Sequence, residues 1–315
     1  MDNEVNNKSV WNEPFFIYRK INKCYGTAVS FISDRFLKII KLALPVVIIS
    51  AIGITALLYM WCDAGIELSV TSYLWFYVLA IGVSIITVSL VMAVLYRIID
   101  VNIEGLNVYS VGYRYVYNRV FVNKFARAIC FNLIVLAIGT LLVAAIHFID
   151  SLILTHIDPH DIDEKSFIIN WTIRIVAFII IMVILIPMYI PLNKLMLHNK
   201  GFKQSFLNGY KMGWTKWGKI FSLEVLVVIT ITIIALFVLA PAYVIALMQH
   251  SATLSKIQGD AVDVPEYFTY ITILILFIAS VFIVILMLFK FLPQAYLYAS
   301  VLTDEQQIDR IKTAK

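Results

Sequence analysis

The sequence predicts an all-α fold, a polytopic membrane helical bundle with six transmembrane helices. Three features predict it: an apolar composition, six long apolar spans, and a charge distribution that alternates between those spans. Hydrophobic residues make up 61% of the 315 residues and charged residues 14%, against ~45–50% and ~25% in an average soluble protein. A soluble chain of this size would lack the charge to cover its apolar surface, so lipid is its expected solvent.

The spans follow from the thickness of the bilayer. A hydrocarbon core of ~30 Å requires ~20 apolar residues in a helix, and the qualifying stretches run over residues 42–60, 73–96, 128–149, 168–192, 221–248 and 267–289. These stretches are continuously apolar, whereas the strands of a membrane barrel alternate, so helices are favoured. We expect a cytoplasmic N-terminal amphipathic segment, a six-helix transmembrane domain and a cytoplasmic C-terminal tail, over residues 1–41, 42–300 and 301–315.

Basic and acidic residues lie on opposite sides of the predicted spans. Four segments hold 22 of the 25 Lys and Arg residues: those before the first span, after the second, after the fourth and after the sixth. The other three loops are acidic. The positive-inside rule therefore places both termini in the cytoplasm, and we expect a multi-pass protein of a bacterial inner membrane. Because the basic residues flank apolar spans and form no dense patch, nucleic-acid binding is not expected.

Two basic segments, residues 113–127 and 202–219, interleave Lys and Arg with aromatic side chains. This pattern is typical of an amphipathic helix at the cytoplasmic headgroups, which would bind anionic membrane lipids. The alternative is that each segment extends the following transmembrane helix into the cytoplasm. The candidate lipid-facing residues are Arg114, Arg119, Lys211, Trp214, Lys216 and Trp217.

An internal repeat is indicated by Gly26, Gly112 and Gly209, each of which precedes an odd-numbered span. An aromatic residue follows each glycine at the fifth position and a charged residue at the fifteenth. The spacing predicts three related helical hairpins. On these glycine–aromatic–basic segments and the six-span layout, the chain resembles bacterial inner-membrane proteins of the YciC-like type. That resemblance implies a six-helix inner-membrane protein and no particular activity.

Glu224 is the acidic residue that we place inside an apolar span. A carboxylate at that depth either pairs with a cation or takes up a proton. Glu224 and Arg127 each lie fifteen residues after their repeat glycine, so Arg127, or Lys41 at the corresponding position, is a candidate partner in a structural ion pair. The alternatives are a proton-coupled transport site and a carboxylate held by Lys216 or Lys219 of its own segment.

Other polar or helix-breaking features of the spans have a functional and a structural interpretation. The prolines, including Pro187 and Pro191, either shape a transport site or are accommodated by neighbouring groups, and we favour the second. Arg174 either pairs with an acidic residue of the adjacent loop or reaches the interface alone. His156 and His160 lie among carboxylates, but Pro159 separates them, so a solvated acidic loop is a better interpretation than a metal site.

Three function classes come into question: a scaffold, a transporter and an intramembrane enzyme. The sequence favours a lipid- or partner-binding scaffold or assembly factor, with a membrane-protein partner or a second copy of the chain as its protein contact. The alternative is a small-molecule or lipid transporter. We find no cysteine cluster, nucleotide-binding loop or catalytic constellation, so neither a metal, a cofactor nor enzymatic activity is expected.

Overall fold

The computed structural model describes residues 14–63, 70–154, 165–198, 201–257 and 265–313, and over these ranges the chain forms helices and turns without a β-strand. Six of the described helical segments are long and apolar enough to cross a membrane. The predicted all-α, six-span membrane fold is therefore confirmed. A chain with these spans is a multi-pass membrane protein, because only a bilayer accommodates so many helices of this length and composition.

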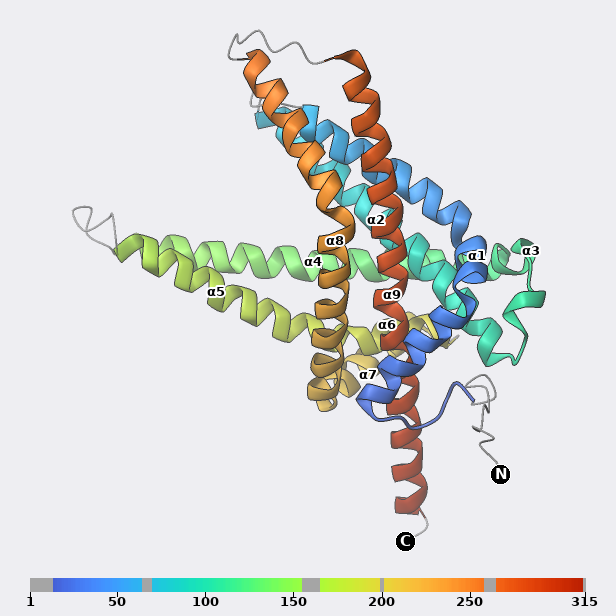
Figure 1. Ribbon diagram of the computed structural model, residues 1–315. Helices are drawn as coiled ribbons and strands as arrows, with labels where there is room; N and C mark the ends of the chain where they lie inside the picture. Colours follow the sequence, from blue (N-terminus) through green and yellow to red (C-terminus); the bar gives the residue numbers. More distant parts are fainter. Residues whose placement is uncertain (1–13, 64–69, 155–164, 199–200, 258–264, 314–315) are drawn as a thin grey trace, which may run out of the picture. The chain divides into compact units, whose positions relative to one another are not determined.

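The helices follow one another as Figure 1 shows. Their bounds are α1 Ile21–Asp63, α2 Val70–Ile103, the 3₁₀ helix η2 Val108–Ser110, α3 Tyr113–Val116, α4 Arg119–Leu154, α5 Lys165–Leu185, the 3₁₀ helix η4 Ile186–Met188, α6 Tyr189–Leu197, α7 Phe202–Thr215, α8 Trp217–Ile257 and α9 Glu266–Thr313. The chain forms two compact units. The first comprises Met1–Ala128 and Ser222–Lys315, and the second Ile129–Phe221.

The core of the first unit lies where α1, α2 and α9 pack together. Residues 91–99 of α2 and 291–301 of α9 are buried without interruption, so both helices are surrounded on all sides there. Tyr96 and Tyr298 are among the largest fully buried side chains.

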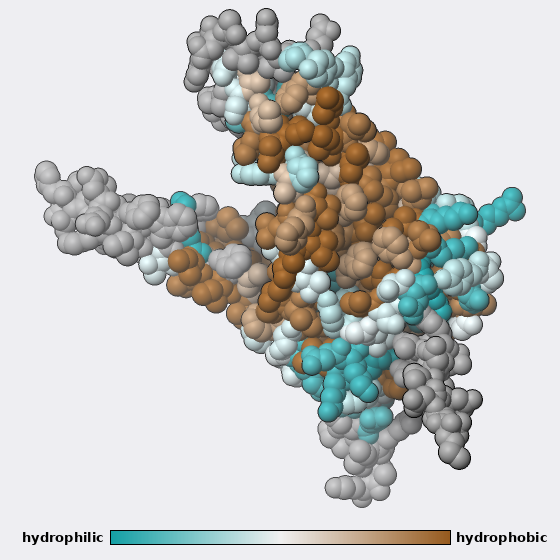
Figure 2. All heavy atoms as spheres, viewed as in Figure 1, coloured by the Kyte–Doolittle hydropathy of each residue, from teal (hydrophilic) through white to brown (hydrophobic). Residues whose placement is uncertain are grey.

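Much of the exposed surface of the spans is apolar. Large hydrophobic side chains are exposed along them, such as Leu74 at 62%, Leu141 at 71% and Phe237 at 81%. Figure 2 shows hydrophobic side chains over most of the visible helical surface and hydrophilic side chains toward the ends of the helices. An exposed surface of this kind suits contact with lipid acyl chains.

In the second unit, α7 packs closely against η4 and α6. Gly209 faces Pro191, whose Cα would lie 2.7 Å from a β-carbon at that glycine, and a β-carbon at Gly213 would meet the carbonyl oxygen of Pro187. Both contacts require the absence of a side chain on α7. The spacing of four residues in each pair places both glycines on one face of α7, against both prolines.

The helix bounds show how three of the predicted segments are built. The predicted segment 113–127 divides into α3 and the first turns of α4, so from Arg119 onward it extends a transmembrane helix. The segment 202–219 divides at Lys216 (φ −113°, ψ 17°) into the separate helix α7 and the start of α8. The predicted tail, residues 301–315, begins within α9, which continues as far as Thr313.

Candidate functional site

A basic stripe runs along the exposed face of α7. Lys203, Leu207, Lys211 and Trp214 follow one another at intervals of four, four and three residues, and all are exposed. Ser205, Gly209 and Gly213 form the opposite, buried face. The glycine–proline contacts therefore orient α7 so that two lysines, an indole and a leucine point away from the unit. We call Lys203, Leu207, Lys211 and Trp214 the α7 stripe.

Lys216 and Trp217 do not belong to this stripe. Lys216 occupies the break between α7 and α8 and is half-buried. The indole N–H of Trp217 donates a hydrogen bond to the carbonyl oxygen of Val183 at 3.2 Å, and its ring stacks on Phe221 with centroids 4.9 Å apart. Of the two tryptophans predicted to face lipid, Trp217 thus directs its polar edge into the second unit and Trp214 lies exposed.

Arg114 and Arg119 lie exposed in the first unit, beside two tyrosines that bind α1. The hydroxyl of Tyr113 donates to the carbonyl oxygen of Lys41 at 2.7 Å, and that of Tyr117 donates to the carbonyl oxygen of Leu42 at 2.8 Å. Burial raises the pKa of the Tyr117 hydroxyl to about 12, so the phenol stays protonated and remains a donor at neutral pH.

A buried ionic cluster joins the ends of α2 and α4. Arg97, 4% exposed, donates from Nη1 to Asp100 Oδ2 at 2.7 Å and from Nη2 to the Tyr115 carbonyl at 2.9 Å. Lys124 Nζ lies 3.0 Å from the other oxygen of Asp100. The arginine also stacks on the ring of Tyr115, whose hydroxyl donates to Glu104. One carboxylate thus bridges two cations and fastens α2 to α4.

This ionic cluster is not predicted from the sequence. Arg97 and Lys124 were counted with the cytoplasmic basic residues, because a loop charge and a buried charge look alike in a sequence. The available signal was the spacing of Arg97 and Asp100 by three residues, which places both on one helix face. The bridge to Lys124 depends on the packing of α4 against α2 and has no local signature.

Glu224 lies on α8 and is bound by α9. Gln294 Nε2 donates to Glu224 Oε2 at 2.5 Å, and Lys290 Nζ lies 3.6 Å from Glu224 Oε1. Gln294 is buried, whereas the Lys290 side chain is 38% exposed. Of the predicted partners, Arg127 is half-buried on α4 and Lys41 is exposed on α1, and their pairing with Glu224 stays a prediction.

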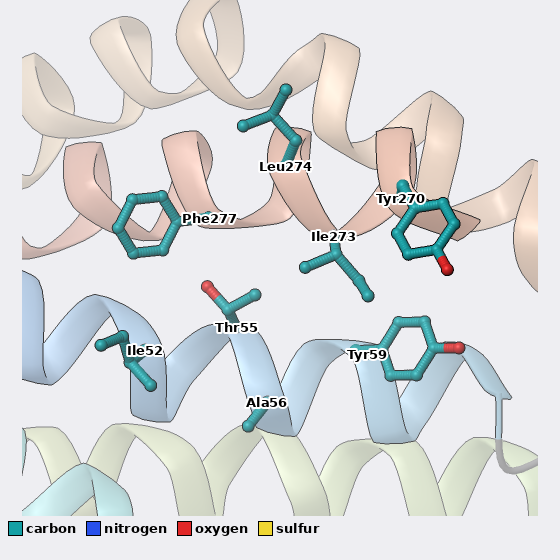
Figure 3. A pocket seen from close by; sticks show the side chains of 8 residues that line it. All are labelled: Ile52, Thr55, Ala56, Tyr59, Tyr270, Ile273, Leu274 and Phe277. Carbon is teal, nitrogen blue, oxygen red and sulfur yellow. The ribbon is translucent and has the colours of Figure 1, made fainter. Parts of the chain in front are cut away.

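An apolar groove lies between parts of α1 and α9 in the first unit. Its volume is about 460 Å³, and Figure 3 shows the side chains that line it: Ile52, Thr55, Ala56, Tyr59, Tyr270, Ile273, Leu274 and Phe277. Thr55 Oγ1 lies 2.7 Å from the Ala51 carbonyl oxygen and 3.1 Å from Ser280 Oγ, so its hydroxyl is satisfied within the protein. Apart from the hydroxyls of Tyr59 and Tyr270, the groove therefore presents mainly hydrocarbon to a ligand.

No protein-family model, curated protein or solved structure matches the chain. Its function has to be inferred from its geometry.

Two further candidates remain, Arg174 and the acidic loop that contains His156 and His160. Arg174 lies exposed on α5. The predicted acidic loop with His156 and His160 lies outside the described residues. Within the described ranges, no group of three or more His, Cys, Asp or Glu side chains is placed to hold a metal ion.

Proposed function

We propose that the chain is a membrane scaffold or assembly factor that binds anionic lipid at the cytoplasmic face of a bacterial inner membrane. The observation that supports this most is the α7 stripe. Close glycine–proline packing fixes the helix, and Lys203 and Lys211 then project together with Trp214 and Leu207. Basic residues beside an indole are the side chains that bind anionic headgroups.

The rest of the chain supports a binding role more than a catalytic one. Several polar side chains buried in the first unit hold helices together, as the ionic cluster and the contacts of Glu224 do. In this proposal both termini are cytoplasmic, and the apolar surface contacts lipid, a membrane-protein partner or a second copy of the chain. Kinship with YciC-like proteins stays a prediction.

The binding of anionic lipid is tested with the full chain in detergent. Each Lys near an anionic surface contributes about 1 kcal/mol, so Lys203→Gln with Lys211→Gln should weaken the binding of phosphatidylglycerol by about thirtyfold. The affinity for phosphatidylcholine should not change. Native mass spectrometry with each lipid measures both.

The matched control replaces the same two residues by arginine, which keeps both charges, and should preserve the binding of phosphatidylglycerol. If the glutamine variant binds this lipid as well as the wild-type chain does, the α7 stripe is not an anionic-lipid surface.

Lipid transport is the rival function, and the apolar groove between α1 and α9 favours it. A transporter would accelerate the movement of a labelled lipid between the leaflets of reconstituted vesicles, whereas a scaffold would leave that rate unchanged.

A further inference from the structure

A second, polar cavity lies in the first unit, at the break of α1. Its volume is about 400 Å³, and it is lined by Asp34, Arg35, Asn102, Gly105, Leu106, Asn107 and Tyr109. The backbone of Arg35 is not helical (φ −125°, ψ 17°). The cavity thus forms where α1 breaks, opposite the turn that follows α2. None of its residues belongs to the α7 stripe.

The wall opposite α1 is a defined turn. Gly105 has a φ of 70°, the left-handed conformation that glycine adopts at a helix end. Leu106 N donates to the Val101 carbonyl at 3.0 Å and Gly105 N to that of Asn102 at 3.3 Å, which is the Schellman arrangement. The α2 helix therefore ends at a fixed position.

The turn is also fastened to α1. Asn107 Oδ1 accepts a hydrogen bond from the backbone N–H of Tyr109 at 3.0 Å, and the Tyr109 hydroxyl donates to the Asp34 carbonyl oxygen at 2.9 Å. The Arg35 guanidinium lies 5.3 Å from the ring centroid of Phe31. Asn107, Tyr109 and Arg35 of the cavity wall are thus held in place by contacts within the protein.

The surroundings of the cavity place it at the edge of the hydrocarbon. Beside it, α1 exposes 83% of Leu37 and 39% of Phe36, and 42% of Leu106 is exposed on the opposite wall. The apolar run of the first span begins a few residues later, at Leu42. Apolar side chains around a polar cavity suit the boundary between acyl chains and headgroups.

The charges in the cavity suit a ligand that carries both signs. Arg35 supplies a planar guanidinium, which binds phosphate oxygens through parallel hydrogen bonds. Asp34, the preceding residue, supplies a carboxylate that would repel a purely anionic headgroup and pair with an ammonium group. Asn102 and Asn107 add amide donors and acceptors.

We propose that this cavity binds the phosphoethanolamine headgroup of a zwitterionic phospholipid, with Arg35 on the phosphate and Asp34 on the ammonium group. A primary ammonium has three N–H donors for the carboxylate, whereas a choline group has none. The site therefore distinguishes phosphatidylethanolamine from phosphatidylcholine. It goes beyond the proposed anionic-lipid surface, and either site can fail its test while the other stands.

The test uses native mass spectrometry of the full chain with phosphatidylethanolamine and phosphatidylcholine of identical acyl chains. The wild-type chain should bind phosphatidylethanolamine at least about tenfold more tightly, because hydrogen bonds to charged groups are strong. Soluble phosphoethanolamine lacks acyl chains and should bind at least about tenfold more weakly than the lipid. If it binds equally well, the ligand is a free metabolite and the lipid assignment is wrong.

Two substitutions separate the roles of the charges. Asp34→Asn should bring the ratio of the two lipid affinities close to one, and Arg35→Gln should weaken the binding of both lipids. Lys23→Gln, which removes an exposed charge of α1 outside the cavity, is the matched control and should change neither affinity. Equal affinities for both lipids in the wild-type chain, or a preference that survives Asp34→Asn, would overturn the proposal.

Discussion

Glu224 illustrates how a charged side chain is accommodated within a span. Its two described contacts differ in kind: a short hydrogen bond from the buried amide of Gln294, and a longer ion pair with the partly exposed Lys290. A hydrogen bond to a charged group contributes about 1.5–3 kcal/mol, whereas an exposed ion pair contributes about 0.2–1 kcal/mol. The amide should therefore stabilise the carboxylate more than the lysine does.

We expect Gln294→Leu to lower the stability of the chain in detergent by more than Lys290→Leu does. Double-mutant cycles with Glu224→Gln, followed by thermal unfolding, give the coupling of each pair. A third cycle combines Glu224→Gln with Arg127→Leu, because the spacing of the repeats predicts Arg127 as the partner of Glu224. A larger coupling for Arg127 than for either α9 residue would support the pairing predicted from the sequence and would show that Gln294 is not the main partner of Glu224.

The sequence predicts that Glu224 requires a partner, because its position in the apolar run places its carboxylate inside the membrane. The amide partner could not be predicted. Gln294 is uncharged and lies seventy positions away, and nothing local shows that α8 and α9 meet there. The basic partner, Arg127 or Lys41, was predicted from the repeat. The spacing of the repeat does not indicate which helices are neighbours.

At the scale of helices, aromatic donors satisfy carbonyl groups that prolines leave free. A proline has no N–H, so the carbonyl four residues earlier loses its helical partner. Pro45 frees the Lys41 carbonyl, which accepts from Tyr113, and Pro187 frees the Val183 carbonyl, which accepts from Trp217. Both donors lie in or next to the short helices α3 and α7 that precede odd-numbered spans.

This compensation can be measured at Trp217. Trp217→Phe should lower the stability by about 1–3 kcal/mol, because the Val183 carbonyl loses its donor while partly buried. In a Pro187→Ala background the backbone N–H returns, so the same substitution should cost at least about 0.5 kcal/mol less. Thermal unfolding of the four proteins in detergent gives the coupling.

Trp214→Phe is the control, since Trp214 lies exposed on α7 and no described hydrogen bond links it to that carbonyl. Its effect should be the same with or without Pro187. Additive effects of Trp217→Phe and Pro187→Ala would show that the indole does not replace the missing N–H.

Helix boundaries were predicted less well than the spans. Apolar run length reports where a helix meets lipid, so all six crossings were found. The length of the apolar run does not indicate that α4 begins as early as Arg119 or that α9 continues through residues 301–313. Those extensions are polar at the sequence level. Contact with neighbouring helices also contributes: Val301, in the predicted tail, is buried.

For the whole molecule, the proposed lipid binding depends on one orientation in the membrane. The α7 stripe meets anionic headgroups of the inner leaflet only if the basic segments face the cytoplasm. The positive-inside rule predicts this orientation from four separate basic segments. The six long apolar helices support the six membrane crossings. The experiment below tests which side of the membrane each loop faces.

The orientation is measured by the accessibility of single cysteines to a reagent added outside sealed cells. Cys24, Cys62 and Cys130 are first replaced, and His160→Cys, Asp260→Cys, Arg119→Cys and Lys211→Cys are then introduced one at a time. An impermeant thiol reagent should modify positions 160 and 260, and should reach 119 and 211 only after the membrane is opened. Modification of position 119 or 211 in intact cells would contradict the orientation and, with it, the proposed lipid surface.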